Sequence, residues 1–276
     1  MLSLLDLPEV QSSIAPLLVS LITGLILLRW APRWTGISVF AGFMTTSLLI
    51  YGTTFIPLTG TRKLVLAIAA ATIAGVAIEL SMSNPLRRRA VLAGLAVLAY
   101  GWVAYRVLLN QEALTFWLYL IGGVLYCAWL VLIFDLIRDN NGATSASVIA
   151  LGAGTSLCAI LSASAVLGQL AAGLAAGAGA LWLLLLAKPE LRLGSETVFS
   201  AALGLGLMGM GGLLFAKLPW FTLVLLGLIP LISYLPRITV LRYWQQAVSY
   251  LLLASVVAAF AVASAWLPME DSASMY

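Results

Sequence analysis

Hydrophobic positions form long runs along the chain, and short segments with charged residues, proline or glycine separate them. A helix rises about 1.5 Å per residue, so roughly 20 apolar residues cross the hydrocarbon core of a membrane. Backbone groups in lipid must pair within their own segment, so such runs are expected to be helices. The pattern predicts ten membrane spans, near Ile14–Leu28, Ile37–Phe55, Leu64–Met82, Ala90–Val107, Ala113–Leu136, Ser145–Ala165, Gly168–Ala187, Thr197–Ala216, Trp220–Leu235 and Tyr243–Leu267.

The division between the sixth and seventh spans rests on length and on charge. A single helix over the uncharged stretch Ser145–Ala187 would be roughly 65 Å long, twice the hydrocarbon thickness, so we expect a tight turn near Ser162–Gln169. With ten spans, the connections after odd-numbered spans carry ten Lys and Arg residues and the others carry four. Merging the two spans would give seven and seven. Because basic loops stay in the cytoplasm, the ten-span threading predicts that both termini are non-cytoplasmic. Both tails are acidic and lack bases: Asp6, Glu9, Glu270 and Asp271.

Composition supports a membrane protein and excludes several function classes. The chain is 63% apolar and 9% charged, against about 45–50% and about 25% in a soluble domain. This balance excludes a soluble enzyme, a disordered chain and a nucleic-acid-binding domain. The absence of histidine removes the commonest metal and haem ligand and the usual general base. Cys127 and Cys158 lie in apolar runs, where they are interpreted as packing residues.

The predicted fold class is therefore an all-α integral membrane protein of about ten transmembrane helices, without a soluble domain. Its 276 residues form one membrane domain, with candidate halves 1–137 and 138–276. We expect a multi-pass protein of the plasma (inner) membrane. No cofactor, metal or nucleic acid is predicted. Membrane lipids are the expected partners, and a homo-oligomer or other membrane subunits are left open.

Two acidic residues lie inside or beside predicted spans. Glu79 is near the cytoplasmic end of the third span, and Asp135 is near that of the fifth. Ionisable groups inside a membrane are costly and often mark an ion or substrate path. Two interpretations stay open. The acids form interfacial ion pairs, Glu79 with Arg87–Arg89 and Asp135 with Arg138, or they share a site at a cytoplasmic gate.

Polar and small residues of the sixth and eighth spans are candidates for substrate binding. Thr155, Cys158 and Ser162 share one helix face because they are spaced three and four residues apart. Such a face either lines a solute cavity or bonds to neighbouring helices. Gly206 and Gly209 belong to a glycine-rich run in the eighth span. This run indicates either tight packing or a pliable, interrupted helix at a binding site.

In size and span count, the chain resembles the drug/metabolite transporter class. That resemblance implies two inverted halves of five helices, which here would meet near Arg138. The expected function is a transporter-like carrier of a small neutral or lipophilic solute, not an enzyme. Two alternatives remain. One is a non-catalytic scaffold subunit of a larger membrane complex, and the other is a membrane enzyme that acts on a lipid-linked substrate through Glu79, Asp135 and Arg87–Arg89.

Overall fold

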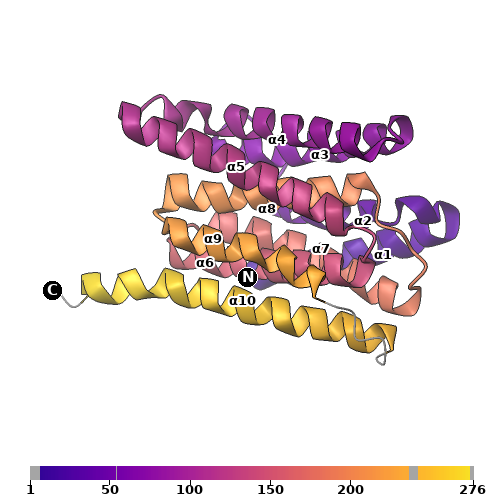
Figure 1. The fold of residues 1–276 in the computed structure, drawn as a ribbon. Coiled ribbons are helices and arrows are strands. Elements are labelled where there is room, and N and C mark those ends of the chain that lie inside the picture. The colour runs from indigo at the N-terminus through magenta and orange to yellow at the C-terminus, as the bar shows by residue number, and fades with distance from the viewer. Residues whose placement is uncertain (1–6, 54, 236–241, 274–276) are drawn as a thin grey trace.

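The structure is a computed structural model that describes residues 7–53, 55–235 and 242–273, with side chains up to Trp266. Within these residues, every regular element is helical (Figure 1). The described part contains a π-helical turn at Val10–Ile14, α1 (Ala15–Trp30), a 3₁₀ turn at Pro32–Trp34, α2 (Ile37–Tyr51), α3 (Gly60–Ser81), α4 (Pro85–Leu108), α5 (Ala113–Ile137), α6 (Asn141–Leu161), α7 (Ala165–Ala187), α8 (Ser195–Ala216), α9 (Trp220–Leu228), a 3₁₀ turn at Ile229–Tyr234 and α10 (Tyr243–Ala273).

Eight helices of the described part are long and apolar enough to cross a membrane. The two shorter apolar helices are α2 and α9 with its 3₁₀ extension. The 15 residues of α2 rise about 22 Å, less than a hydrocarbon core of about 30 Å. The all-helical prediction is thus confirmed for the described residues, and eight of the ten predicted spans have full spanning length.

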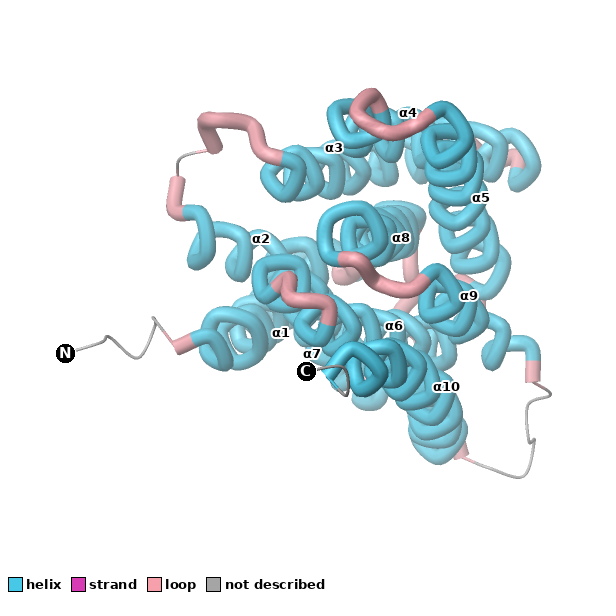
Figure 2. Tube along the Cα trace, turned by 90° about the vertical axis from the view of Figure 1, so that its left-hand side faces the viewer, coloured by secondary structure: helices cyan, strands magenta, loops and turns pink. Residues whose placement is uncertain are grey.

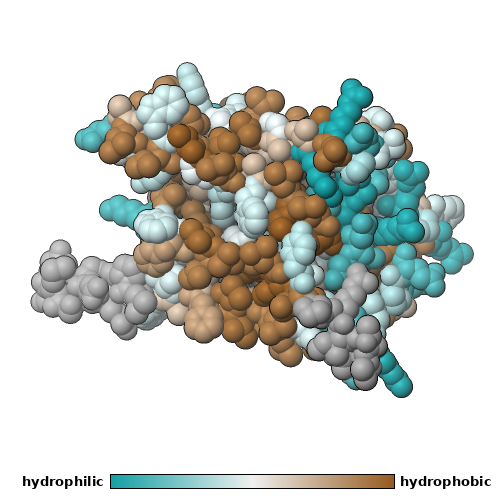
Figure 3. Space-filling view, viewed as in Figure 1, coloured by the Kyte–Doolittle hydropathy of each residue, from teal (hydrophilic) through white to brown (hydrophobic). Residues whose placement is uncertain are grey.

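The sides of the helical bundle are apolar, and one end is polar. Figure 3 shows a broad hydrophobic belt around the visible face and a hydrophilic region at its right-hand end. Large apolar side chains on several helices are exposed, among them Ile22, Leu125 and Phe260. An extended apolar surface of this kind is expected where lipid is the solvent. Together with the eight long helices, it supports a multi-pass membrane protein.

The uncharged stretch is divided where the sequence predicts a turn. Helix α6 ends at Leu161 and α7 begins at Ala165. The Ser164 N–H donates to the Ala159 carbonyl (2.8 Å), and the Ala163 N–H donates to the Ile160 carbonyl (3.0 Å). These two bonds form a Schellman motif, which requires a left-handed residue after the helix. Ala163 fills that position with φ 64°.

Replacing Ala163 with glycine is expected to stabilise the protein by up to about 1 kcal/mol, because glycine has no Cβ to disfavour the left-handed region. Equilibrium unfolding in mixed micelles would measure the change. Ser164→Gly, one residue beyond, is the control and should not stabilise, since Ser164 has φ −119°. A destabilised Ala163→Gly variant would contradict this account of the turn.

Helix α8 lies in the centre of the bundle, as the view along the helices shows (Figure 2). Its residues from Ser195 to Gly212 are all buried. Helices α3 and α5 pack against it, and α2 packs against α7. Small residues permit these close contacts: a Cβ on Gly75 of α3 would lie 2.5 Å from the Glu196 Cα of α8. Helix α8 is continuous, so its interpretation as an interrupted helix is wrong.

The two candidate halves are not packed identically. Helices α2 and α7 contact each other, as do α3 and α8, and each pair is five helices apart in the chain. Helix α10 packs along α6, whereas α5 lies against α8 and far from α1 (Figure 2).

Some of the charged residues used in the predicted threading lie outside the described residues. These are Asp6 and Arg237, and the side chains of Glu270 and Asp271.

Candidate functional site at the basic end

Four connections between helices meet at the polar end of the bundle, on the right in Figure 3. We call this the basic end; it comprises the connections α1–α2, α3–α4, α5–α6 and α7–α8. Arg33, Glu79, Arg138 and Arg192, which come from these connections or the helix ends beside them, line one cavity there. The ten-span threading predicts that these odd-numbered connections share one side, and the structure agrees.

The first ion-pair cluster joins α4 to α5. Asn84 caps α4 by accepting hydrogen bonds from the Leu86 N–H (2.9 Å) and the Arg87 N–H (3.3 Å), which places the arginines in the first turn. Arg88 donates from Nε to Asp135 Oδ1 (3.0 Å) and from Nη2 to Asp135 Oδ2 (3.1 Å). Arg89 Nε donates to Oδ2 at 3.0 Å. The Asp135 side chain is 1% exposed, so one buried carboxylate holds two cations.

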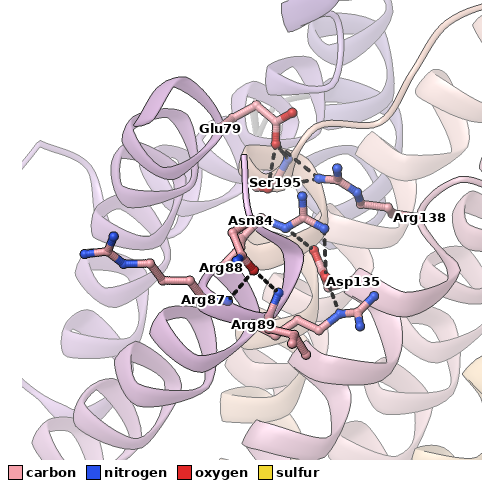
Figure 4. A network of polar contacts seen from close by, with 9 residues as sticks. Glu79, Asn84, Arg87, Arg88, Arg89, Asp135, Arg138 and Ser195 are labelled. Carbon is pink, nitrogen blue, oxygen red and sulfur yellow. Dashed lines mark hydrogen bonds and ion pairs between the residues drawn. The ribbon is translucent and has the colours of Figure 1, made fainter. Parts of the chain in front are cut away.

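The second cluster joins α3, α5 and α8 (Figure 4). Glu79 Oε2 accepts hydrogen bonds from the Ser195 N–H (3.0 Å) and from the Ser195 hydroxyl (2.6 Å). Arg138 Nη1 donates to the same oxygen at 3.1 Å and to Ser195 Oγ at 3.2 Å. The Glu79 side chain therefore satisfies the first backbone N–H of α8 and also neutralises Arg138.

The predicted ion pairs form with exchanged partners. Glu79 pairs with Arg138, and Asp135 pairs with Arg88 and Arg89, whereas the sequence suggested the reverse. The exchange is a consequence of tertiary packing, because α3 lies beside the start of α8 while the first turn of α4 faces the end of α5. The Arg87 side chain points away from both clusters in Figure 4. The two acids lie in separate clusters at one end of the bundle, not in a shared acidic site.

A further carboxylate, Glu196, was missed because the sequence placed the start of its span at Thr197. Glu196 is 0% exposed and stands in the first turn of α8. Its Oε1 accepts a hydrogen bond from the Thr197 hydroxyl at 3.3 Å, and its Oε2 has no partner among the described residues. A helix N-terminus stabilises an acidic residue by about 0.3–1 kcal/mol. Burial of an unpaired charge costs on the order of several kcal/mol, so the helix end does not offset it.

The cavity at the basic end has a volume of about 780 Å³. Asn141 helps to shape it: its side chain donates to the Leu191 carbonyl and accepts from the Leu193 N–H (3.4 Å), which fixes the α7–α8 connection. The cavity is lined by Arg33, Glu79, Arg138, Asp139, Asn141, Pro189, Glu190, Arg192, Leu193 and Gly194. Three side chains are basic and three are acidic, so the lining has no formal net charge.

The candidate binding residues of α6, of its C-terminal cap Ser162 and of α8 are buried and lie away from this lining. Thr155, Cys158 and Ser162 are buried, and the Thr155 hydroxyl has no partner among the described residues. Gly206 faces Cys127 of α5, and Gly209 faces Tyr126 and Leu223. The glycines thus permit close packing against α5 and α9, as the packing interpretation expects. The Tyr126 hydroxyl beside Gly209 is likewise buried and unpartnered in the described part.

No histidine is available to bind a metal, and the described residues contain no group of three or more Cys, Asp or Glu that could hold one. The charged and polar side chains at the basic end can supply ion pairing, hydrogen bonding and proton exchange at carboxylates. No family model matches this chain, and a comparison with curated proteins finds no match.

Proposed function

We propose that the protein is a membrane carrier, not an enzyme, and that it admits a small, polar solute without net charge from the basic end. The observation that carries this proposal is the polar cavity of about 780 Å³ among the α1–α2, α5–α6 and α7–α8 connections. Ligand cavities typically have volumes of about 300–1,000 Å³. Three arginines face three acids around it, which favours a solute that is neutral or zwitterionic over a lipophilic one.

The two ion-pair clusters at the basic end would act as the closed gate of the cavity. Arg138, Glu79 and Ser195 tie α3, α5 and α8 together. A solute that moved beyond the cavity would have to separate α3 from α8, because their backbones touch at Gly75. In the core, the unpartnered hydroxyls of Thr155 and Tyr126 would offer hydrogen bonds to a neutral solute. We propose that this inner binding region comprises Thr155, Cys158, Ser162, Gly206 and Gly209.

The proposed orientation places the basic end in the cytoplasm. Of the Lys and Arg residues in the described part, most stand at this end, and cytoplasmic loops are the basic ones. Both termini would then be non-cytoplasmic in a plasma (inner) membrane, with five helices in each half of the carrier. Membrane lipids, and a second copy or other membrane subunits, are the partners that this arrangement allows.

Purified protein should be stabilised against heat, in a saturable manner, by at least one compound in a panel of neutral and zwitterionic polar metabolites. The Arg192→Gln variant changes an exposed side chain of the cavity lining and should weaken this effect without changing the melting temperature of the free protein. The matched control is Arg106→Gln, at the opposite end of the bundle, which should leave ligand stabilisation intact. An entirely negative panel would argue against a carrier, and stable co-purification of a second chain would favour the scaffold alternative.

A further inference from the structure

The Glu196 carboxylate is enclosed where three parts of the bundle meet. Its backbone lies against α3 at Gly75, where a Cβ would stand 2.5 Å from the Glu196 Cα. The neighbouring Thr197 is held by the α1–α2 connection, since a Cβ on Gly36 would overlap the Thr197 hydroxyl at 1.7 Å. Glu196 is 0% exposed, and its Oε2 has no partner among the described residues.

Two of the arginines near Glu196 are already neutralised by other acids, and Arg33 and Arg192 are exposed. Arg138 of the α5–α6 connection pairs with Glu79 of α3, and Arg88 of α4 pairs with Asp135 of α5. Arg33 of the α1–α2 connection is exposed and stacks on its neighbour Trp34. Helices α2, α6, α7 and α9 have no charged residue in their sequences. Glu196 therefore lies next to another carboxylate, that of Glu79, and has no cation of its own among the described contacts.

The position of Glu196 leaves a short route to solvent. Gly194 lines the cavity at the basic end, and a Cβ on Gly194 would stand 2.1 Å from Glu196 Oε2. Gly194 therefore contacts both this oxygen and the cavity. A small movement of the α7–α8 connection would therefore bring cavity water to the carboxylate, although the closed arrangement hides it.

We propose that Glu196 is a proton-binding site. It holds a proton while the α7–α8 connection is closed over it, and it returns this proton to cavity water when this connection opens. An unpaired buried carboxylate is far more stable as the neutral acid, and hydration stabilises the ionised form. The proton comes from water and returns to water, without electron transfer. This inference deepens the proposed carrier function. It rests on that function in one respect only: the bound proton would be the ion whose movement is coupled to solute transport.

Infrared difference spectroscopy on the purified protein in lipid vesicles tests the site without any solute. At neutral pH, wild-type protein should show the C=O stretch of a protonated carboxyl group. The band should be absent in Glu196→Gln, shifted in Glu196→Asp and unchanged in Glu190→Gln. Glu190 is the matched control because it is an exposed acid of the same cavity. A spectrum in which Glu196→Gln loses no protonated carboxyl band overturns the proposal.

Hydrogen–deuterium exchange of residues 188–194 in wild-type protein gives a second, independent measurement. After correction for the intrinsic pH dependence of amide exchange, opening of this connection should become more frequent as pH rises, because ionisation of Glu196 favours the open arrangement. Glu196→Gln should show no such dependence. If the wild-type exchange has no residual pH dependence, the proposed release on opening is wrong. If the carboxyl band is observed but no compound stabilises the protein against heat, the proton-binding site is supported and only the carrier function is rejected.

Discussion

Replacing Asp135 with asparagine is expected to destabilise the protein by about 3–5 kcal/mol, the usual cost of removing one partner from a buried ion pair. The Asp135 carboxylate binds Arg88 through two hydrogen bonds and Arg89 through a third. The Arg88 side chain is 9% exposed, so without the carboxylate its charge would stay buried and unpaired. Arg89, with 29% of its side chain exposed, can turn towards solvent and contributes less to the loss.

Equilibrium unfolding in mixed micelles measures this effect. Asp139→Asn is the matched control: Asp139 is an exposed acid four residues away at the same end of the bundle, and surface substitutions usually change stability by less than about 0.5 kcal/mol. A double variant, Arg88→Met with Asp135→Leu, should recover most of the loss because it removes both buried charges. If Asp135→Asn unfolds like the wild type, the cluster does not stabilise the contact between α4 and α5.

Replacing Gly75 with alanine should cost about 1–3 kcal/mol, the range for overpacking a close contact. The added Cβ would lie 2.5 Å from the Glu196 Cα, 2.8 Å from the Glu196 N and 2.9 Å from the Ser195 carbonyl oxygen. All three are backbone atoms, so no change of side-chain rotamer relieves the overlap. Helix α3 must move away from α8, which also strains the hydrogen bonds from Ser195 to Glu79.

Gly94→Ala on α4 is the control for this substitution. Gly94 is also a mid-helix glycine, but a Cβ there meets nothing within 4 Å. Alanine is the better helix former by about 0.8–1.0 kcal/mol, so Gly94→Ala should keep or raise the stability. If Gly75→Ala lowers the free energy of unfolding and Gly94→Ala does not, the close α3–α8 contact is supported. A Gly75→Ala variant as stable as Gly94→Ala would contradict it.

Several local features could be predicted because their cause is local. The break between α6 and α7 follows from a limit on helix length and from the distribution of basic residues. The start of α4 also has a local signal, because Asn84 can cap a helix and Pro85 suits the first helical position, although the predicted span begins at Ala90. The acids Glu79 and Asp135 could be identified as candidates because charge within an apolar run is unusual and costly.

Other features depend on contacts between distant segments and could not be predicted. The partners of Glu79 and Asp135 depend on which helix ends meet, and 59 residues separate Glu79 from Arg138. Glu196 lies beside charged loop residues in the sequence, and contacts with other parts of the bundle, α3 among them, bury it. The glycines of α8 left both tight packing and a pliable, interrupted helix open, because glycine frequency alone does not distinguish these two uses. The contacts of Gly206 and Gly209 show that these glycines permit close packing.

The sequence by itself indicated a multi-pass membrane protein, the helical secondary structure and the alternation of the connections between two ends. These follow from the length and polarity of single segments, each of which must satisfy its own backbone in lipid. The tertiary structure decided which charges pair, which carboxylate has no cation among the described residues and where a polar cavity opens. Those outcomes depend on distances between side chains far apart in sequence, and Coulomb and hydrogen-bond energies change steeply over such distances.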